Sequence, residues 1–337
     1  MVPGGTLAKV LFVCALLAVL ALAAPFASPY VKLLAARVCI FAILAMSVDV
    51  LLGYTGLPSL GQAAYLGMGA YLAAILASRY EIGLGCDFVL VLLGGFVFGA
   101  LAAAFFGLFA MRAAGVYFLI ITLALGMVVW GLAYRWNGLT GGDNGINVFS
   151  RPTCGVSLAS DLSFLYVALA LFALMLGLLY VLVNSPFGRT LVGIRESEPR
   201  MRMLGYNTWL HRYLAFVIAG GCGGIAGVMW THLTGIVSPE DVFLTTSVDA
   251  LLVVVLGGPG TLIGAALGTA VVVFLREYLS TLVPWWQYVL GGVYVLTILY
   301  LPEGLMGLPA RLRRGRLQLT PRKAVTVRES ASAESRS

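Results

Sequence analysis

A chain of 337 residues that is 61% hydrophobic and 10% charged, with a mean hydropathy of +0.98, carries too much apolar surface for a water-soluble protein. Lipid admits only helices or a closed barrel, and the apolar runs here are continuous rather than alternating, which excludes the barrel. The net charge of +7 comes from loops and the C-terminal tail, so it does not indicate nucleic-acid binding. We therefore expect an all-α, polytopic transmembrane helical bundle.

Ten apolar runs follow one another along the chain as candidate spans. They lie at roughly 7–24, 31–52, 60–78, 88–110, 116–135, 162–183, 213–234, 247–257, 261–280 and 285–301. The run at 247–257 is too short to cross about 30 Å of hydrocarbon alone. A Gly-Gly-Pro-Gly sequence at 257–260 separates it from the next run and indicates a broken or re-entrant element. We therefore expect eight to ten spans, some of them Gly-rich broken helices.

The first run has two interpretations. Lys9 precedes apolar residues 10–24, and Ala21-Leu22-Ala23 resembles a signal-peptidase site. If the run is instead retained as a helix with its N-terminus inside, 15 of the 21 Lys and Arg residues fall on the inner side. The positive-inside rule then predicts that both the N-terminus and the C-terminus are cytoplasmic.

The sequence GYTGLPSLGQ at 53–62 interrupts the helical pattern, because its glycines and proline disfavour a regular helix. One interpretation is a plain cytoplasmic turn. The other is a broken helix beside a substrate path, as transporters often have. In the second case the polar residues near the break are candidates to line the path: Tyr54, Thr55, Ser59 and Gln62, with Thr122 from the fifth run. Segment 256–264 weakly resembles segment 52–61, by duplication or by chance.

Glycines also recur at a spacing of four inside the spans. The repeats are Gly220/Gly224, Gly223/Gly227 and Gly260/Gly264/Gly268. Small residues at this spacing allow helix backbones to approach closely in lipid, so we expect tight helix packing there.

The loop at 184–212 concentrates charge that the rest of the chain lacks. We expect a short helix in it, with Glu196 and Glu198 near its positive N-terminal end and Gly205 at its C-terminal end. Pro199 fits only in the first turn. The loop is either a solvated topology determinant or a docking helix that presents Met203, Leu204 and neighbouring side chains to a partner.

No pattern in the chain indicates catalysis, a metal site or a bound cofactor. The phosphate-binding loop and the HExxH, CxxC and GxSxG motifs are missing from the sequence. The acids within spans, Asp49, Asp249 and Glu277, lie near span ends, where a functional role, snorkelling or capping would each explain them. Without a chain of buried carboxylates or histidines, proton coupling is disfavoured, and we do not expect an enzyme.

Two cysteines, Cys86 and Cys154, fall in predicted outer loops and could form a disulfide if the outside is a periplasm.

The basic, serine-rich tail at 309–337 is expected to be a disordered cytoplasmic segment, either a simple topology anchor or one lying on anionic lipid. Residues 1–308 would then form the membrane domain.

Four stretches resemble the permease subunits of high-affinity ABC importers for leucine, isoleucine and valine. They are LLGYTGLPSLGQAAYLGMGAYLAA (51–74), GVYFLIITLALGMVVW with LTGGDNGI (115–146), SPFGRTLVGIRESEPRMRMLGYN with YLAFVIAG (185–220), and VVVLGGPGTLIGAALGT with YLPEGLMGL (253–308). The third and fourth stretches carry the resemblance most specifically. The likeness covers most of residues 30–308.

The resemblance implies a function and a set of partners. Such permeases form half of a pathway in the bacterial inner membrane, with a second homologous permease, two cytoplasmic ATP-binding subunits and a periplasmic substrate-binding protein. ATP hydrolysis belongs to the partners. The positions matching the family's ATPase-docking helix are Arg195, Glu196, Glu198, Met203, Leu204 and Gly205, although Pro199, Arg200, Met201 and Arg202 replace its usual small residues. Urea or short amides are alternative substrates within the family, and a proton-coupled carrier or a non-transport scaffold are alternatives outside it.

Overall fold

The computed structural model describes residues 21–80, 82, 87–113, 115–148, 153–154, 156–157, 160–282, 284–301 and 304–307. Its long helices are α2 (Pro29–Asp49), α3 (Gln62–Tyr80), α4 (Phe88–Ala110), α5 (Val116–Arg135), α7 (Asp161–Asn184), α10 (Thr208–Thr234), α11 (Leu244–Gly257), α12 (Leu262–Leu282) and α13 (Trp286–Tyr300). Within these ranges six helices are long and apolar enough to cross a membrane, and α11 and α13 are shorter apolar helices. The all-α polytopic prediction is confirmed.

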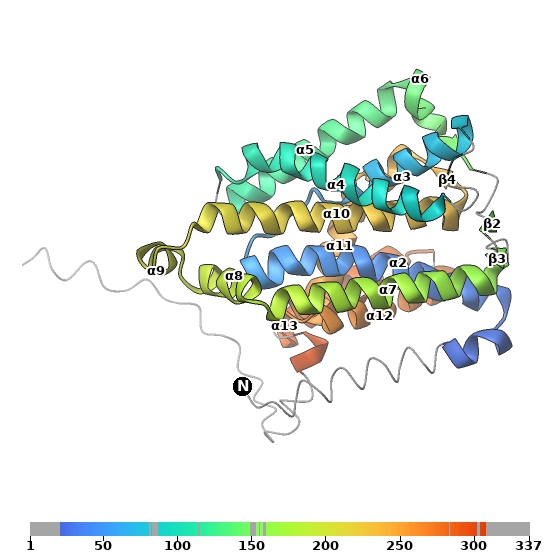
Figure 1. Ribbon diagram of the computed structural model, residues 1–337. Helices are drawn as coiled ribbons and strands as arrows, with labels where there is room; N and C mark the ends of the chain where they lie inside the picture. Colours follow the sequence, from blue (N-terminus) through green and yellow to red (C-terminus); the bar gives the residue numbers. More distant parts are fainter. Residues whose placement is uncertain are drawn as a thin grey trace, which may run out of the picture.

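Short elements connect these helices. They are η1 (Ala24–Phe26), the π-helix η2 (Val50–Thr55), α6 (Asn137–Thr140), η3 (Gly142–Asn144), α8 (Pro186–Glu196), α9 (Glu198–Met203), η4 (Pro239–Val242) and η5 (Leu305–Gly307). Strand β1 (Ile146–Asn147) pairs antiparallel with β4 (Ile236–Val237), and β2 (Thr153–Cys154) pairs antiparallel with β3 (Val156–Ser157). Helices α8 and α9 lie at one end of the bundle and the strands lie at the other (Figure 1).

The predicted spans correspond to helices wherever the structure describes them. Nine of the ten runs match α2, α3, α4, α5, α7, α10, α11, α12 and α13, with ends that differ by a few residues. Residues 7–20 of the first run and the tail at 309–337 lie outside the described residues, whereas the possible cleavage site, Ala21-Leu22-Ala23, is described and is helical. Four helices begin where side chains satisfy free backbone N–H groups, because Ser28, Ser160, Ser185 and Asn207 cap α2, α7, α8 and α10.

Helix α10 occupies the centre of the bundle and packs most extensively on α3 and α4. The backbones almost touch there: a Cβ on Gly224 would lie 2.0 Å from the Gly95 carbonyl oxygen, and one on Gly227 would lie 1.9 Å from the Leu66 carbonyl oxygen. Close contact also holds α12 against α11, where a Cβ on Gly268 would lie 2.4 Å from the Val253 carbonyl oxygen. The glycine repeats therefore act as predicted, by allowing close helix packing.

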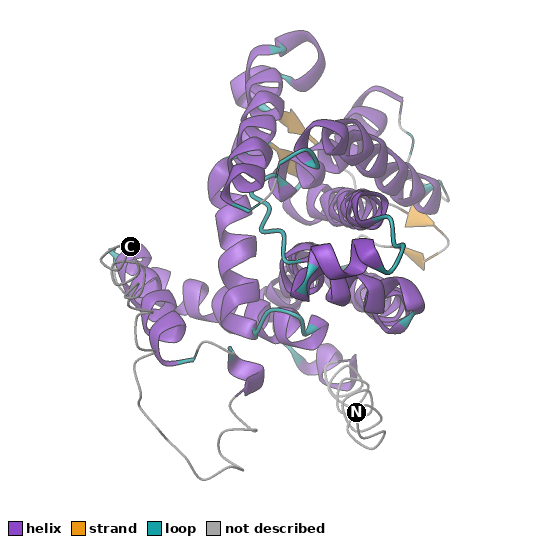
Figure 2. Cartoon of the chain, turned by 90° about the vertical axis from the view of Figure 1, so that its left-hand side faces the viewer, coloured by secondary structure: helices purple, strands orange, loops and turns teal. Residues whose placement is uncertain are grey.

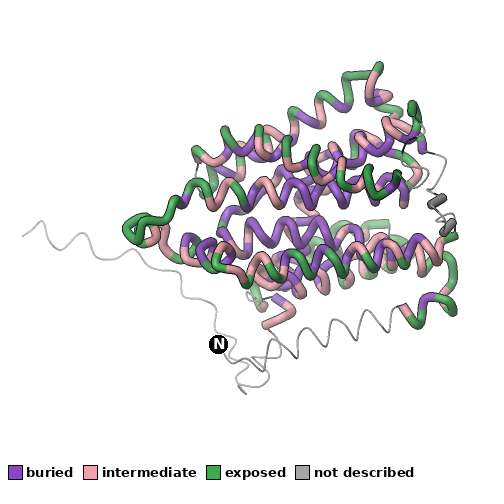
Figure 3. Tube along the Cα trace, viewed as in Figure 1, coloured by how far each residue is buried: buried purple, intermediate pink, exposed green. Residues whose placement is uncertain are grey.

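Helix α2 forms a second centre and packs on α7, α10 and α12. Viewed from the α8–α9 end, several of the long helices run nearly along the line of sight (Figure 2). Buried residues concentrate on α2 and α10, whereas α9 and the outward faces of α4 and α5 are exposed (Figure 3). The exposed faces are rich in large apolar side chains, such as Leu90 and Leu101 of α4, as expected for contact with lipid.

The predicted interruption between α2 and α3 is present and buried. Helix α2 continues into the π-helix η2, and Gly56, with φ of 72°, ends it. The irregular segment 56–61 then runs through the protein interior, since Leu57 and Ser59 are almost inaccessible to solvent. This burial fits a broken helix whose backbone polar groups are satisfied by protein, and it does not fit a solvated turn.

Candidate functional site

Helix α8 ties the charged loop to the membrane helices. It begins at Pro186, where the Ser185 hydroxyl accepts a hydrogen bond from the Gly188 amide. Its apolar side chains, Leu191 and Ile194, are almost completely buried, so one face of the helix is fixed to the bundle. Arg195, in its last turn, extends toward the break after α2.

The start of helix α9 is held by ion pairs and a hydrogen bond of Glu198. Glu198 pairs with Arg212 at 2.7 Å and with Arg202 at 2.6 Å, and it accepts a hydrogen bond from the Thr208 hydroxyl at 3.1 Å. Partial burial raises the pKa of Glu198, but the nearby arginines and the Thr208 bond outweigh it and hold that pKa below the ordinary 4.5. The Glu198 carboxylate is therefore ionised at neutral pH and anchors α9 to α10.

The end of α9 presents apolar side chains to solvent. Gly205 adopts φ of +86°, and the Tyr206 amide bonds back to the Met201 carbonyl, which closes the helix. Met203 is 91% exposed and Leu204 is 66% exposed. Met201, in contrast, points back toward Gly193 of α8. Pro199 lies in the first turn, as the sequence required.

Helix α8, the stretch where α2 continues into η2, and the turn between α11 and α12 meet at one place. We call this contact the junction and define it by Arg195, Gly53, Asp49 and Gly260. The Arg195 guanidinium donates to the Gly53 carbonyl in η2. The Gly260 amide, between α11 and α12, donates to the Asp49 carboxylate at 2.7 Å. Gly53 lies directly on Gly260, where a Cβ on Gly53 would be 2.1 Å from the Gly260 nitrogen. The two Gly-rich segments that resemble each other in sequence therefore meet in space.

The polar residues predicted near the break converge where α3 begins. The Thr122 hydroxyl of α5 accepts a bond from the Leu60 amide at 3.2 Å, and Ser247 of α11 accepts one from the Ala63 amide at 2.9 Å. Gln62 is fully buried, and neither atom of its amide group has a hydrogen-bond partner among the described residues. Gln62 also lies against Gly223, near the middle of α10. The packing here therefore leaves a buried carboxamide with its donor and its acceptor both unpaired among the described residues.

Of the remaining predicted pathway residues, two form hydrogen bonds with backbone groups of the broken segment. The Thr55 hydroxyl bonds the Leu51 carbonyl within η2, and the Ser59 hydroxyl accepts from the Gly61 amide at 3.3 Å. Tyr54 is half-buried in η2. Thr55 and Ser59 therefore help to satisfy the broken backbone, and the structure brings Ser59, Gln62 and Thr122 together.

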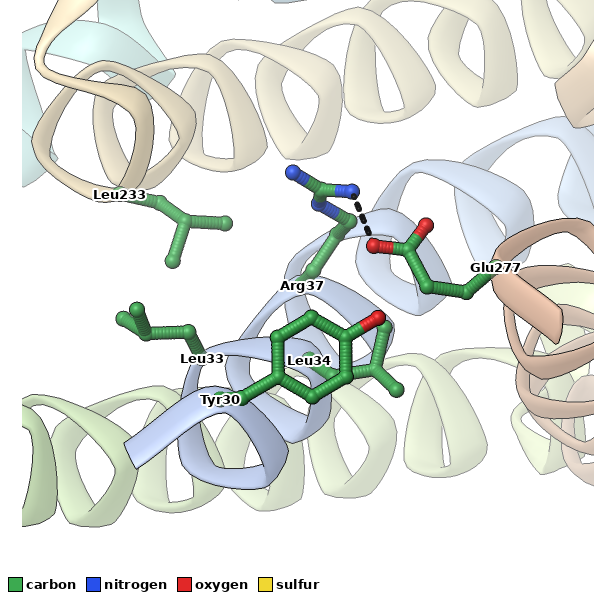
Figure 4. Close-up of a pocket in the computed structure, with 6 residues that line it drawn as sticks. All are labelled: Tyr30, Leu33, Leu34, Arg37, Leu233 and Glu277. Atoms are coloured by element: carbon green, nitrogen blue, oxygen red, sulfur yellow. Dashed lines mark ion pairs between the residues drawn. The ribbon is translucent and has the colours of Figure 1, made fainter. Parts of the chain in front are cut away.

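A cavity of about 160 Å³ lies at the opposite end of the bundle from α9, between α2, α10 and α12. It is lined by Tyr30, Leu33, Leu34, Arg37, Leu233 and Glu277 (Figure 4). Sequence reasoning singled out Glu277 but missed Tyr30 and Arg37. The available signal was an arginine six residues beyond the start of the apolar run at 31–52.

Two other predictions have limited structural coverage. Cys86 and the side chain of Cys154 lie outside the described residues, so the disulfide stays a prediction. Among the residues that the structure describes, no group of three or more His, Cys, Asp or Glu side chains is placed to hold a metal ion.

The family model described as the permease component of the branched-chain amino acid transport system matches residues 30–299. The chain belongs to this permease family. The match runs from the start of α2 to the end of α13, so the family's shared region includes the junction and the buried break.

Curated members of the permease family align with nearly the whole chain. High-affinity branched-chain amino acid transport system permease proteins LivM are 32% identical in Salmonella typhimurium and 33% identical in Escherichia coli, over 90% of this chain and 76% of each relative. The autoinducer 2 import system permease protein LsrC of Salmonella choleraesuis is 27% identical over 81% of this chain and 75% of that protein. No solved structure matches the chain.

Proposed function

We propose that this chain forms one half of the pathway of an ATP-driven importer for branched-chain amino acids in the bacterial inner membrane. The match to the permease family over residues 30–299, with LivM proteins as relatives at 32–33% identity, supports this function. The second half is a homologous permease, and a periplasmic binding protein delivers the substrate. Two cytoplasmic ATP-binding subunits contact the α8–α9 end, and both chain ends are cytoplasmic.

Helix α9 is the contact with an ATP-binding subunit in this proposal. Its exposed Met203 and Leu204 are apolar side chains beside exposed charge, a combination that suits docking into a groove of a soluble partner. The ion pair of Glu198 with Arg212 and its hydrogen bond with Thr208 connect α9 to the start of α10, so a push on α9 is passed to the bundle. Glu196 is exposed at the end of α8 and is available to the same partner.

The junction carries this movement to the broken helices. Arg195 connects α8 to η2, and Asp49 connects α2 to the turn between α11 and α12. Displacement of α8 therefore shifts both interrupted segments together. These segments are bonded onward, because the Leu60 amide donates to Thr122 and Ser247 of α11 accepts from the Ala63 amide. Such rigid-body transmission between two packings is how alternating access is commonly driven.

A pair of arginine variants tests the coupling. Arg195→Ala removes the bond to the Gly53 carbonyl, whereas Arg189→Ala changes an exposed arginine in the first half of the same helix. We expect Arg195→Ala complexes to assemble but to lose most stimulation of ATP hydrolysis by loaded binding protein, and Arg189→Ala complexes to keep it. Normal stimulation in an assembled Arg195→Ala complex would contradict the proposed route.

A second pair of variants tests docking. Leu204→Asp places a charge on the exposed tip of α9, where we expect the ATP-binding subunit to co-purify poorly. Ile236→Asp serves as a control, because Ile236 of β4 is also an exposed apolar residue but lies outside the membrane spans, at the opposite end of the bundle from α9 (Figure 1). If Leu204→Asp leaves subunit recovery unchanged, α9 is not the docking element.

Substrate and energy source are tested by uptake into cells that express the assembled transporter. Radiolabelled leucine uptake should be competed by isoleucine and valine, and not by urea or by autoinducer 2. Depletion of ATP should abolish it, whereas collapse of the proton gradient at constant ATP should not. Competition by urea alone would favour the amide alternative, and dependence on the proton gradient would overturn the ABC mechanism.

A further inference from the structure

The cavity between α2, α10 and α12 combines one cation, one anion and a short apolar wall. Arg37 and Glu277 both line it and form an ion pair, with their nearest charged atoms 3.6 Å apart (Figure 4). The Tyr30 hydroxyl points toward Glu277, and Leu33, Leu34 and Leu233 form the apolar part. Tyr30 is 58% exposed, so the cavity is reachable from the surface of the chain.

The two charges lie inside membrane-spanning helices. Arg37 is eight residues beyond the start of α2, a depth of about 12 Å along the helix, and Glu277 is five residues before the end of α12. Ionised side chains at such depth are costly and mark substrate or ion paths by default. Here the two residues pair with each other, and the cavity beside them is where a ligand would meet both charges.

The ion pair is loose enough to exchange partners. Well-formed pairs between a guanidinium and a carboxylate have N–O distances of about 2.7–2.9 Å and are often bidentate. The single 3.6 Å contact falls short of that geometry, and both side chains keep partial access to solvent. A ligand carrying its own anion and cation can separate the two residues while leaving each of them paired.

We propose that this cavity is a receiving site for a free aliphatic amino acid. The α-carboxylate binds the Arg37 guanidinium, the α-ammonium binds the Glu277 carboxylate and the Tyr30 hydroxyl, and the side chain lies against Leu33, Leu34 and Leu233. A dry apolar cavity of about 150 Å³ accepts a molecule of benzene's size, so a cavity of about 160 Å³ has room for a four-carbon side chain. The choice of an amino acid rests on the proposed transport function.

A lipid headgroup offers the same pair of charges, because phosphoethanolamine also carries an anion and a cation. The apolar wall distinguishes the two ligands, since only the amino acid places a short hydrocarbon branch beside its charges. The experiment therefore compares L-leucine with phosphoethanolamine. It also includes isovalerate, which lacks the ammonium group and one carbon of leucine, and isopentylamine, which lacks only the carboxylate.

The measurement is binding of these small molecules to the full-length chain in phosphatidylcholine nanodiscs, by saturation-transfer difference NMR. We expect saturable binding of L-leucine and at least about tenfold weaker binding of isovalerate, isopentylamine and phosphoethanolamine, because each charge-assisted bond is among the strong ones. Binding of phosphoethanolamine as tightly as leucine would assign the cavity to lipid and overturn the proposal. Absence of saturable leucine binding to the wild-type chain would also overturn it.

Paired variants locate the binding. The double variant Arg37→Gln with Glu277→Gln keeps the net charge and should weaken leucine binding about tenfold or more. The matched control is Arg276→Gln with Asp249→Asn, which removes the 3.4 Å pair formed by the adjacent residue of α12 outside the cavity lining. The control should bind leucine within about twofold of wild type. Equal binding by the double variant and wild type would refute the site.

A cavity-filling variant avoids the charges altogether. Leu233→Phe should exclude leucine while L-alanine binding changes little, a shift in selectivity that general misfolding would not produce. Unchanged leucine preference in a folded Leu233→Phe protein would contradict the proposed placement of the side chain. If the transporter takes up leucine normally with ATP but leucine does not bind in this cavity, the binding site is rejected and the proposed transport function stands. If leucine binds in the cavity but the transporter carries only urea, the proposed transport substrate is rejected.

Discussion

Replacement of Gly53 by alanine should damage the junction between η2 and the turn after α11. The added methyl group would lie 2.1 Å from the Gly260 nitrogen and 2.2 Å from the Asp49 carboxylate, whereas ordinary contacts exceed 3.4 Å. The nearest groups include backbone, so relief requires shifts of more than about 1 Å. Overpacking costs about 1–3 kcal/mol. Loss of the bond between the Gly260 amide and Asp49 adds about 1.5–3 kcal/mol, which gives roughly 3–6 kcal/mol in total.

The assay combines thermal unfolding of the purified chain with leucine uptake by the assembled transporter. At roughly 2 °C per kcal/mol, Gly53→Ala should lower the unfolding midpoint by about 6 °C or more. Gly177→Ala is the control, because a Cβ at that position of α7 meets nothing within 4 Å and alanine favours a helix. A Gly53→Ala protein with a midpoint within about 1 °C of wild type and with normal uptake would refute the reasoning about this contact.

Three further changes have defined outcomes. Gly205→Ala should cost about 1–2 kcal/mol, since φ is +86° there although the space is open, and faster amide exchange in α9 would reveal it. Glu198→Gln should lower the free energy of unfolding by about 1 kcal/mol. Because folding lowers the pKa of Glu198, the variant should unfold at a lower temperature than wild type above pH 4.5. This difference should vanish as the pH falls through the folded pKa, where wild-type Glu198 is also uncharged. Ser247→Ala leaves the buried Ala63 amide without its acceptor, so the chain should lose about 1–3 kcal/mol in thermal unfolding, whereas Ser247→Thr should retain most of the stability.

Local chemistry made much of the fold predictable from the sequence. Hydrophobic runs determined the long helices, and glycine spacing predicted where α10 and α12 approach their neighbours closely. The ends of α9 followed from Glu198 at its start, a proline in the first turn and Gly205 after its last turn. Glu196 was also expected near the start of this helix, but that prediction was wrong: Glu196 is the last residue of α8, because Ser197 adopts an extended conformation and separates the two helices. Each of these signals acts within a few residues, so no knowledge of tertiary contacts was needed.

The sites depend on contacts between distant segments, and there the sequence was less informative. Arg195 was expected among surface charges, yet its guanidinium reaches the Gly53 carbonyl, 142 residues away in sequence. The cavity at Arg37 and Glu277 forms only when α2, α10 and α12 are brought together. Gln62 could be named as a polar residue near a break, but its lack of partners follows from the packing of α10 against α3.

The near contact of glycine backbones among α3, α4 and α10 also limits how this protein can move. Where side chains separate two helices, a change of rotamers lets one helix slide past the other. Here Gly69, Gly95 and Gly99 lie directly on the α10 backbone, so no rotamers can reorganise at these contacts. We expect these three helices to move as a single block. The hinges of a transport cycle then belong in η2, in segment 56–61 and in the turn at Gly258–Gly260, where the chain is already interrupted.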